Sequence, residues 1–170
     1  SDGKPYLNIP DKYNSEFTIH SIFTQCKNPK NVLLIGGGII GLLNEILKYD
    51  INKVDYVDPD IEFFYLIEPY LDSTLISSLY NKKVNIVECD GRDFVNKTNN
   101  KYDVVILFIT DPTTLNQNRF FTLEFFYSIK TILTDEGIFS ISFTSSEDYF
   151  SEELKQYNAS IYHTFKKIFP

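Results

Sequence analysis

The chain has 170 residues, of which 43% are hydrophobic, and this size and composition suit one folded domain with its own core. Its formal net charge is −7 and only two of its 16 basic residues are arginine, so we expect no nucleic-acid partner. The acidity suits a small cationic ligand, although an acidic surface also simply keeps soluble proteins apart.

The sequence contains neither a signal peptide nor an apolar run of about 20 residues that could span a bilayer, so we expect a soluble, cytoplasmic domain. Cys26 and Cys89 form no C-x-x-C motif, and with His20 and His163 they give no metal-site spacing. We therefore expect two free, buried thiols and no metal. The chain lacks methionine, which leads us to expect an excised part of a longer protein.

Apolar runs separated by helix-length segments predict an alternation of strands and helices along most of the chain. The predicted strands are 32–36, 53–57, 84–88, 103–109 and 137–143, the last after a turn at Asp135-Glu136-Gly137. The predicted helices are 39–49, 60–69, 71–80, 91–97, 119–133 and 149–168, with Pro69 separating the second from the third. This alternation predicts an α/β fold, a Rossmann-like doubly wound sheet of the class I methyltransferase type. Right-handed crossovers give it a strand order of 3-2-1-4-5.

The first thirty residues do not fit this alternation, so we divide the chain into a segment 1–30 and a ligand-binding domain 31–170. Within the first segment, Tyr6–Ile9 is predicted as a short strand and Phe17–Cys26 as a gatekeeping helix over the mouth of the site.

A glycine-rich segment follows the first predicted strand. Gly36, Gly38 and Gly41 have the G-x-G-x-x-G spacing, which permits a tight turn and close approach of a ligand to the backbone. The motif is typical of nucleotide-type cofactor loops. By itself it could also be a turn that only joins strand to helix.

Acidic residues follow three of the predicted parallel strands. Asp58 lies about 20 residues beyond the first glycine, where a carboxylate that binds ribose belongs. Asp90 follows the third strand, beside the expected adenine ring, and Asp111 follows the fourth. Because these positions share one edge of the sheet, they favour an S-adenosyl ligand over a dinucleotide.

These motifs resemble the spermidine synthase (polyamine aminopropyltransferase) family from about Leu7 to Pro170. The residues that carry the resemblance are Gly36-Gly-Gly-Ile-Ile-Gly41, Leu42-Leu-Asn-Glu-Ile-Leu-Lys48, Val54-Asp-Tyr-Val-Asp58, Asp90-Gly-Arg-Asp-Phe94, Tyr102-Asp-Val-Val105 and Asp111-Pro112. A second set is similar to the bacterial branch fused to membrane-spanning segments: Asp111-Pro-Thr-Thr-Leu-Asn-Gln-Asn-Arg-Phe-Phe-Thr122, Ser145-Ser-Glu147 and Asn158-Ala-Ser-Ile-Tyr162. It implies attachment to such segments outside this chain.

The resemblance implies that decarboxylated S-adenosylmethionine, or S-adenosylmethionine itself, is the co-substrate and that a cationic polyamine accepts the transferred group. It implies ligand contacts from Gly36, Gly37, Gly38, Gly41, Asp58, Asp90 and Gly91, with Asp58 on the ribose and Asp90 on the adenine amino group. The resemblance implies that Asp111 and His20 contact the amine, although His20 could equally be a surface residue of its helix. We also expect a homodimer.

Two departures from the family pattern bear on catalysis. An acid usual in the glycine loop is missing at Ile39, and Phe108 occupies the position of the aspartate that deprotonates the attacking amine. Phenylalanine cannot accept a proton, so Asp111 is the remaining candidate base and we expect slow transfer. Two alternatives stay open: a degenerate domain of a membrane-associated protein that binds S-adenosyl compounds or polyamines without turnover, and a methyltransferase.

Overall fold

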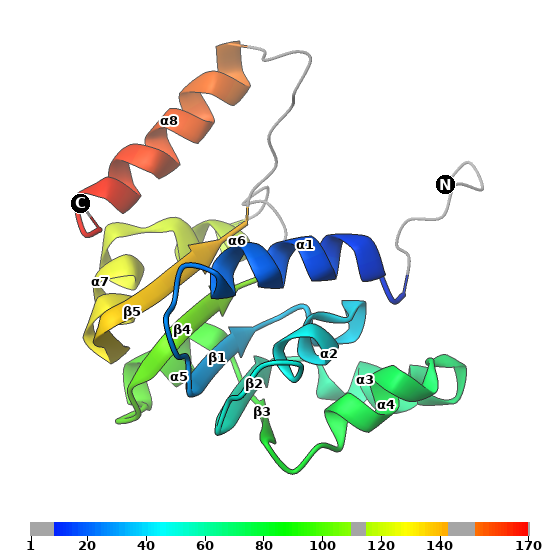
Figure 1. Cartoon of the computed structure of the whole chain (residues 1–170). Helices are drawn as coiled ribbons and strands as arrows, with labels where there is room; N and C mark the ends of the chain where they lie inside the picture. The colour runs from blue at the N-terminus through cyan, green and yellow to red at the C-terminus, as the bar shows by residue number, and fades with distance from the viewer. Residues whose placement is uncertain (1–8, 110–114, 143–151, 170) are drawn as a thin grey trace.

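The computed structural model of the protein contains a five-stranded parallel sheet with helices on both faces (Figure 1). It describes residues 9–109, 115–142 and 152–169. The strands are β1 (Asn31–Ile35), β2 (Lys53–Asp58), β3 (Val84–Glu88), β4 (Tyr102–Leu107) and β5 (Leu133–Ile141). Their order is β3-β2-β1-β4-β5, with every neighbouring pair parallel. The predicted α/β class and strand order are confirmed.

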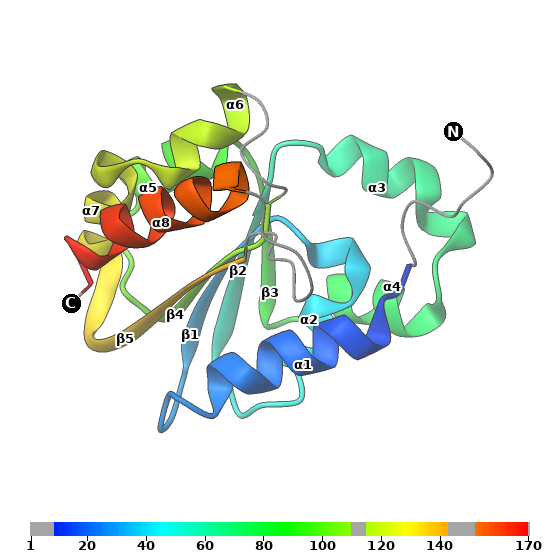
Figure 2. The same ribbon diagram turned by 90° about the horizontal axis from the view of Figure 1, so that it is seen from above.

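Two layers of helices cover the sheet. The α-helices are α1 (Lys12–Phe23), α2 (Leu42–Ile46), α3 (Ile61–Ile67), α4 (Ser73–Leu79), α5 (Gly91–Lys97), α6 (Leu115–Asn118), α7 (Leu123–Ile132) and α8 (Glu152–Lys166). Three short 3₁₀ helices are η1 (Gly38–Ile40), η2 (Glu68–Tyr70) and η3 (Arg119–Phe121). Figure 2 shows α1, α2 and α4 on one face of the sheet and α5, α7 and α8 on the other.

The central strand β1 supplies side chains to the core on both faces. Val32 and Leu34 belong to the cluster under α1 and α2, whereas Leu33 and Ile35 belong to the cluster under α5 and α7. All four are buried. A strand buried on both faces reads as a continuous apolar run, which is why the sequence located it well.

The helix near the N-terminus differs from its prediction. It begins at Lys12 rather than Phe17, because Asp11 caps it by accepting a hydrogen bond from the backbone N–H of Asn14. Its first turn, not the predicted stretch Phe17–Cys26, contacts the glycine segment: the Ser15 hydroxyl donates to the carbonyl oxygen of Ile40 at 3.0 Å. Of the predicted strand Tyr6–Ile9, only Ile9 is among the described residues, and it lies in a bend.

Two predicted helices are interrupted. Gly41 has a φ of +114°, which an α-helix cannot contain, so the predicted helix 39–49 becomes η1 followed by the short α2. Thr122 is extended, with φ −96° and ψ 156°, and its side chain caps α7, so the predicted helix 119–133 is divided into η3 and α7.

The last strand begins earlier than predicted. β5 starts at Leu133, directly after α7, and its pairing with β4 shifts register between Tyr102 and Val104. The predicted turn at Asp135-Glu136-Gly137 therefore lies within an irregularity of the strand. The break at Pro69 between the second and third predicted helices is confirmed, since α3 ends at Ile67 and α4 begins at Ser73. None of the described helices is long and apolar enough to cross a membrane.

Candidate nucleoside-binding site

The candidate site lies where the chain leaves β1, the strand whose neighbours are β2 on one side and β4 on the other. There the Gly36 N–H donates to the Val57 carbonyl at 3.0 Å, and the Phe108 N–H donates to the Ile35 carbonyl at 2.9 Å. In doubly wound sheets, the crevice beyond the carboxyl ends of strands at such a switch point binds ligands.

The glycine segment packs tightly between its neighbours. Gly36 has a φ of +75°, and a Cβ there would lie 2.4 Å from the carbonyl oxygen of Phe108. A Cβ on Gly38 would lie 2.4 Å from the ring of Tyr56. These glycines are therefore required by the turn and by packing, before any ligand is considered.

Asp58 ends β2 with its carboxylate held at both oxygens. The Tyr56 hydroxyl donates to Oδ2 at 2.7 Å, and the backbone N–H of Asp60 donates to Oδ1 at 3.1 Å. A carboxylate has about four lone-pair sites, so two remain after these contacts. They can accept two further donors, such as the two hydroxyls of a ribose.

Tyr56 is a residue that the sequence analysis did not assign to the site. Its ring is fully buried beside Gly38, and burial, followed by the nearby charge and hydrogen bond of Asp58, raises the pKa of its phenol. The phenol therefore stays protonated and donates to Asp58. Its position two residues before Asp58, on the same side of the strand, was the available signal.

Asp90 follows β3 and caps α5. Its Oδ1 accepts hydrogen bonds from the backbone N–H groups of Arg92 at 3.0 Å and Asp93 at 3.2 Å. Its Oδ2 is paired with the guanidinium of Arg119, which approaches from η3. The carboxylate is therefore fixed on both sides, with a quarter of its side chain exposed.

Phe120 and Gly91 pack beside the Asp90–Arg119 pair. The Arg119 guanidinium lies 4.9 Å from the centre of the Phe120 ring, and Phe120 is itself buried. A Cβ on Gly91 would lie 2.5 Å from Ile35 and 3.4 Å from Phe120, so glycine allows α5 to approach the end of β1. The pairing of Arg119 with Asp90 had no signal in the sequence spacing.

Phe108 lies beside the glycine segment. A Cβ on Gly37 would come within 2.7 Å of its ring, and the ring packs against the cluster under α1 and α2. An apolar ring therefore occupies the position where the family resemblance places a carboxylate. Asp111 lies outside the described residues, as does the Asp111-Pro112 turn.

His20 is not brought together with the two aspartates. Its Nδ1 is in contact with the Tyr49 hydroxyl, and its Nε2 lies 3.5 Å from the Glu45 carboxylate, on the α2 side of α1. Glu45 is also paired with Lys48 at 2.6 Å. His20 therefore contacts Glu45 of α2 and Tyr49, which comes after α2 in the chain. The glycine segment is contacted by a different part of α1, its first turn.

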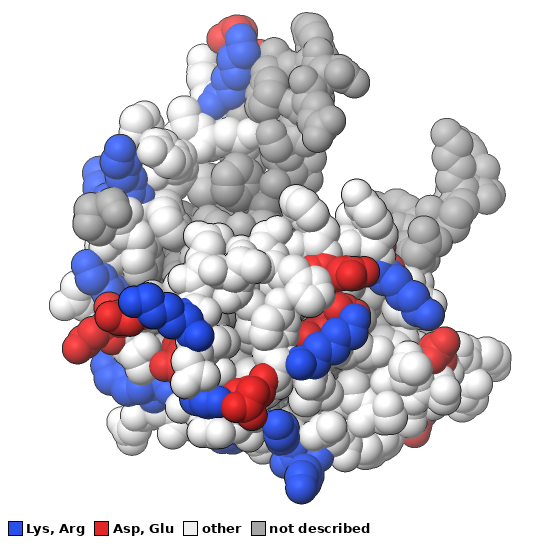
Figure 3. Space-filling model, in the orientation of Figure 1, with Lys and Arg blue, Asp and Glu red and all other residues white. Residues whose placement is uncertain are grey.

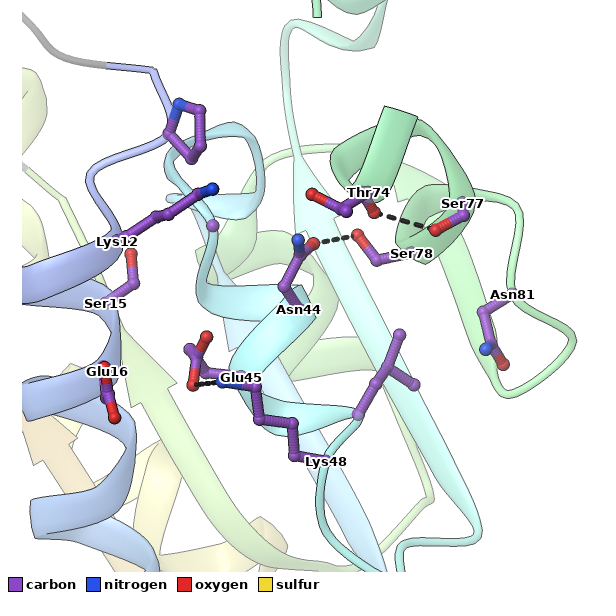
Figure 4. Close-up of a pocket in the computed structure, with 13 residues that line it drawn as sticks. Lys12, Ser15, Glu16, Asn44, Glu45, Lys48, Thr74, Ser77, Ser78 and Asn81 are labelled. Carbon is purple, nitrogen blue, oxygen red and sulfur yellow. Dashed lines mark hydrogen bonds and ion pairs between the residues drawn. The ribbon is translucent and has the colours of Figure 1, made fainter. Parts of the chain in front are cut away.

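A polar cleft of about 490 Å³ lies on one side of the glycine segment (Figure 4). It is lined by side chains from α1, α2 and α4 and by Lys48, which follows α2: Lys12, Ser15, Glu16, Asn44, Glu45, Lys48, Thr74, Ser77 and Ser78. Gly41 lies at its edge, but Asp58 and Asp90 do not line it.

On the face shown in Figure 3, basic and acidic side chains are interspersed. Among the described residues, no group of three or more His, Cys, Asp or Glu side chains could hold a metal ion.

A parallel sheet with a glycine turn at its switch point, and with carboxylates at the end of β2 and after β3, is typical of doubly wound domains of the methyltransferase type. The fold is similar to that of human methyltransferase-like protein 13, solved with SAH, which is 18% identical, with a TM-score of 0.67 over 89% of this chain and 71% of that one.

The chain belongs to the spermine/spermidine synthase family, whose domain model matches residues 11–170. A polyamine aminopropyltransferase of Saccharolobus islandicus is 33% identical over 99% of this chain and 56% of its own length. A spermidine synthase solved with the transition-state analogue AdoDATO is 30% identical, with a TM-score of 0.78 over 94% of this chain and 53% of that one. The resemblance to the spermidine synthase family read from the sequence is confirmed. The chain spans about half the length of the curated relatives it matches.

Proposed function

We propose that this domain binds decarboxylated S-adenosylmethionine and that the protein to which it belongs transfers the aminopropyl group to a polyamine. The observation that carries the proposal is Asp58, whose carboxylate is held by Tyr56 and the Asp60 amide beside the glycine segment, with two lone pairs left. The family membership and the relatives' names support this reaction over the two alternatives.

The residues have separate tasks in this proposal. Asp58 accepts the ribose hydroxyls, Asp90 accepts the adenine amino group, and the glycine segment lies along the chain that carries the sulfonium. We assign contact with the amine to Asp111. For His20, whose side chain contacts Tyr49 and Glu45, we favour the second role, that of a surface residue of its helix.

The reaction needs one proton acceptor and no acid. A neutral amine nitrogen attacks the methylene carbon next to the sulfonium, the carbon–sulfur bond breaks, and its electrons stay on sulfur, which leaves as a neutral thioether. The amine then loses a proton. Phe108 cannot accept it, so we assign the role of base to the Asp111 carboxylate.

Cationic polyamines fit the chain's net charge of −7, and a cytoplasmic location fits its two unpaired cysteines. A homodimer and attachment to membrane-spanning segments outside this chain remain predictions.

Product analysis tests the proposed function. Incubation with decarboxylated S-adenosylmethionine and putrescine should release methylthioadenosine, and Asp111→Asn should slow the release by about 10²- to 10⁴-fold without weakening nucleoside binding. Phe108 leads us to expect a slow rate for the unaltered chain. Formation of S-adenosylhomocysteine from S-adenosylmethionine and an acceptor would instead identify a methyltransferase, and binding without either product would identify a sensor.

A further inference from the structure

We propose that Arg119 determines the preference of this site for a 6-aminopurine over a 6-oxopurine nucleoside, by holding the Asp90 carboxylate as a fixed hydrogen-bond acceptor. The inference deepens the proposed function and rests on it, because it takes Asp90 to face the purine base.

Three contacts fix the Arg119 guanidinium. Its Nη2 pairs with Asp90 Oδ2, its Nε donates to the Asn116 carbonyl at 2.9 Å, and its carbon Cζ lies 4.9 Å from the centre of the Phe120 ring. A planar guanidinium held at two edges and one face has little freedom to turn. Arg119 is therefore built into η3 as a rigid support, although two fifths of its side chain is exposed.

The contacts of Asp90 determine how many further hydrogen bonds its carboxylate can accept. Oδ1 accepts two backbone N–H groups, from Arg92 and Asp93, and Oδ2 accepts the guanidinium of Arg119. Of about four lone-pair sites on the carboxylate, one remains, on Oδ2. That oxygen can accept one donor.

A single fixed acceptor distinguishes the two purine classes. The 6-amino group of adenine donates a hydrogen bond to it, whereas the 6-oxo group of hypoxanthine would place one acceptor against another. The Arg119 guanidinium, paired with Oδ2, holds that oxygen in the position where it accepts a hydrogen bond from the base. Without Arg119, Oδ2 can turn toward water, and this change weakens the discrimination.

Calorimetry with 5′-methylthioadenosine and 5′-methylthioinosine tests the inference through the ratio of their dissociation constants. We expect a preference of about 100-fold for the adenine nucleoside in the unaltered chain, since a hydrogen bond to a charged group is worth about that factor. In Arg119→Leu we expect less than about 5-fold, and in Arg119→Lys an intermediate value.

Arg92→Leu is the matched control. It removes the chain's other arginine, whose Nη1 donates to the Arg119 carbonyl at 2.8 Å, but it leaves the Arg119 guanidinium in place. Its ratio should equal that of the unaltered chain. A partly unfolded variant binds less of both nucleosides, so the ratio reports on recognition rather than on stability.

The outcomes separate this inference from the proposed function. If the unaltered chain binds neither nucleoside, the proposed function is wrong. If it binds both equally, or if Arg119→Leu keeps the full preference, nucleoside binding stands but the role of Arg119 is wrong. If Arg92→Leu lowers the ratio as much as Arg119→Leu, the effect comes from loosening the segment, which also contradicts the role of the guanidinium.

Discussion

Asp58 ends β2 and Asp90 follows β3, so both lie at the carboxyl ends of strands. Their neighbours nevertheless leave them different numbers of free lone-pair sites. Asp58 receives one hydroxyl and one amide, which leaves two lone-pair sites, whereas Asp90 receives two amides and a guanidinium, which leaves one. Two sites suit a ribose with two hydroxyls, and one suits an amino group. The division of tasks between the two carboxylates thus follows from their neighbours.

Cys89, which precedes Asp90, should be a slow thiol. Both cysteines are half-buried rather than buried as expected, and burial, followed by the charges of Asp90 and Asp93, raises the pKa of the Cys89 thiol. A raised pKa means less thiolate at a given pH, so alkylation should have its midpoint at a higher pH than that of free cysteine. Iodoacetamide rates across pH on Cys26→Ser, which leaves Cys89 as the sole cysteine, measure this. A midpoint at or below that of free cysteine, measured in the same buffer, would contradict the assigned environment.

At the scale of elements, the sequence predicted the strands better than the helix boundaries. Apolar runs located β1 to β4 within two residues at each end. Of these, β1, β2 and β4 are buried on both faces and are therefore continuous apolar runs in the sequence. Helix boundaries depend on caps and on backbone angles, such as those of Gly41 and Thr122, which apolar periodicity does not reveal. For the same reason Asp58 and Asp90 could be predicted from strand ends, whereas their partners Tyr56 and Arg119 depend on packing between elements.

The turn between β1 and α2 should tolerate no side chain at Gly38. A methyl group there would lie 2.4 Å from the Tyr56 ring, which is fully buried, so the ring would have to shift against its packed neighbours. We expect Gly38→Ala to lower the free energy of unfolding by about 1 to 3 kcal/mol and to weaken binding of methylthioadenosine, because a displaced Tyr56 no longer reaches Asp58. Denaturant unfolding and calorimetry measure the two effects.

Ser77→Ala is the control for this substitution, since Ser77 is exposed on α4 and should change the free energy of unfolding by no more than about 0.5 kcal/mol. If Gly38→Ala has the stability and the nucleoside affinity of this control, the close packing of Gly38 on Tyr56 is wrong.

At the scale of the whole molecule, the sheet has two edge strands, β3 and β5, and a largely apolar groove lies along β5. Among the described strands, β5 pairs only with β4. A groove of about 320 Å³ runs along it, with Ile138 and Ile141 of the strand, Ile22 of α1 and Phe165 of α8 among its lining residues. Apolar strand edges that are not covered pair with other chains.

We therefore expect the chain to self-associate through β5. Its mass by light scattering after size exclusion should rise with concentration, and Ser140→Lys, which places a charge in the groove, should reduce the association. A strictly monomeric chain at all concentrations, or association that Ser140→Lys leaves unchanged, would contradict this role of the edge.

The central claim is that a carboxylate after β2 holds the ribose of an adenine nucleoside, and calorimetry with methylthioadenosine on Asp58→Ala tests it most directly. Loss of a charged hydrogen-bond acceptor should cost about 2 to 3 kcal/mol, a loss in affinity of about 30- to 150-fold. Asp50→Ala is the matched control, because Asp50 is an exposed carboxylate paired with Lys30 and lies outside the site. The account predicts a large loss for Asp58→Ala and none for Asp50→Ala. Equal affinity in the two variants would contradict it.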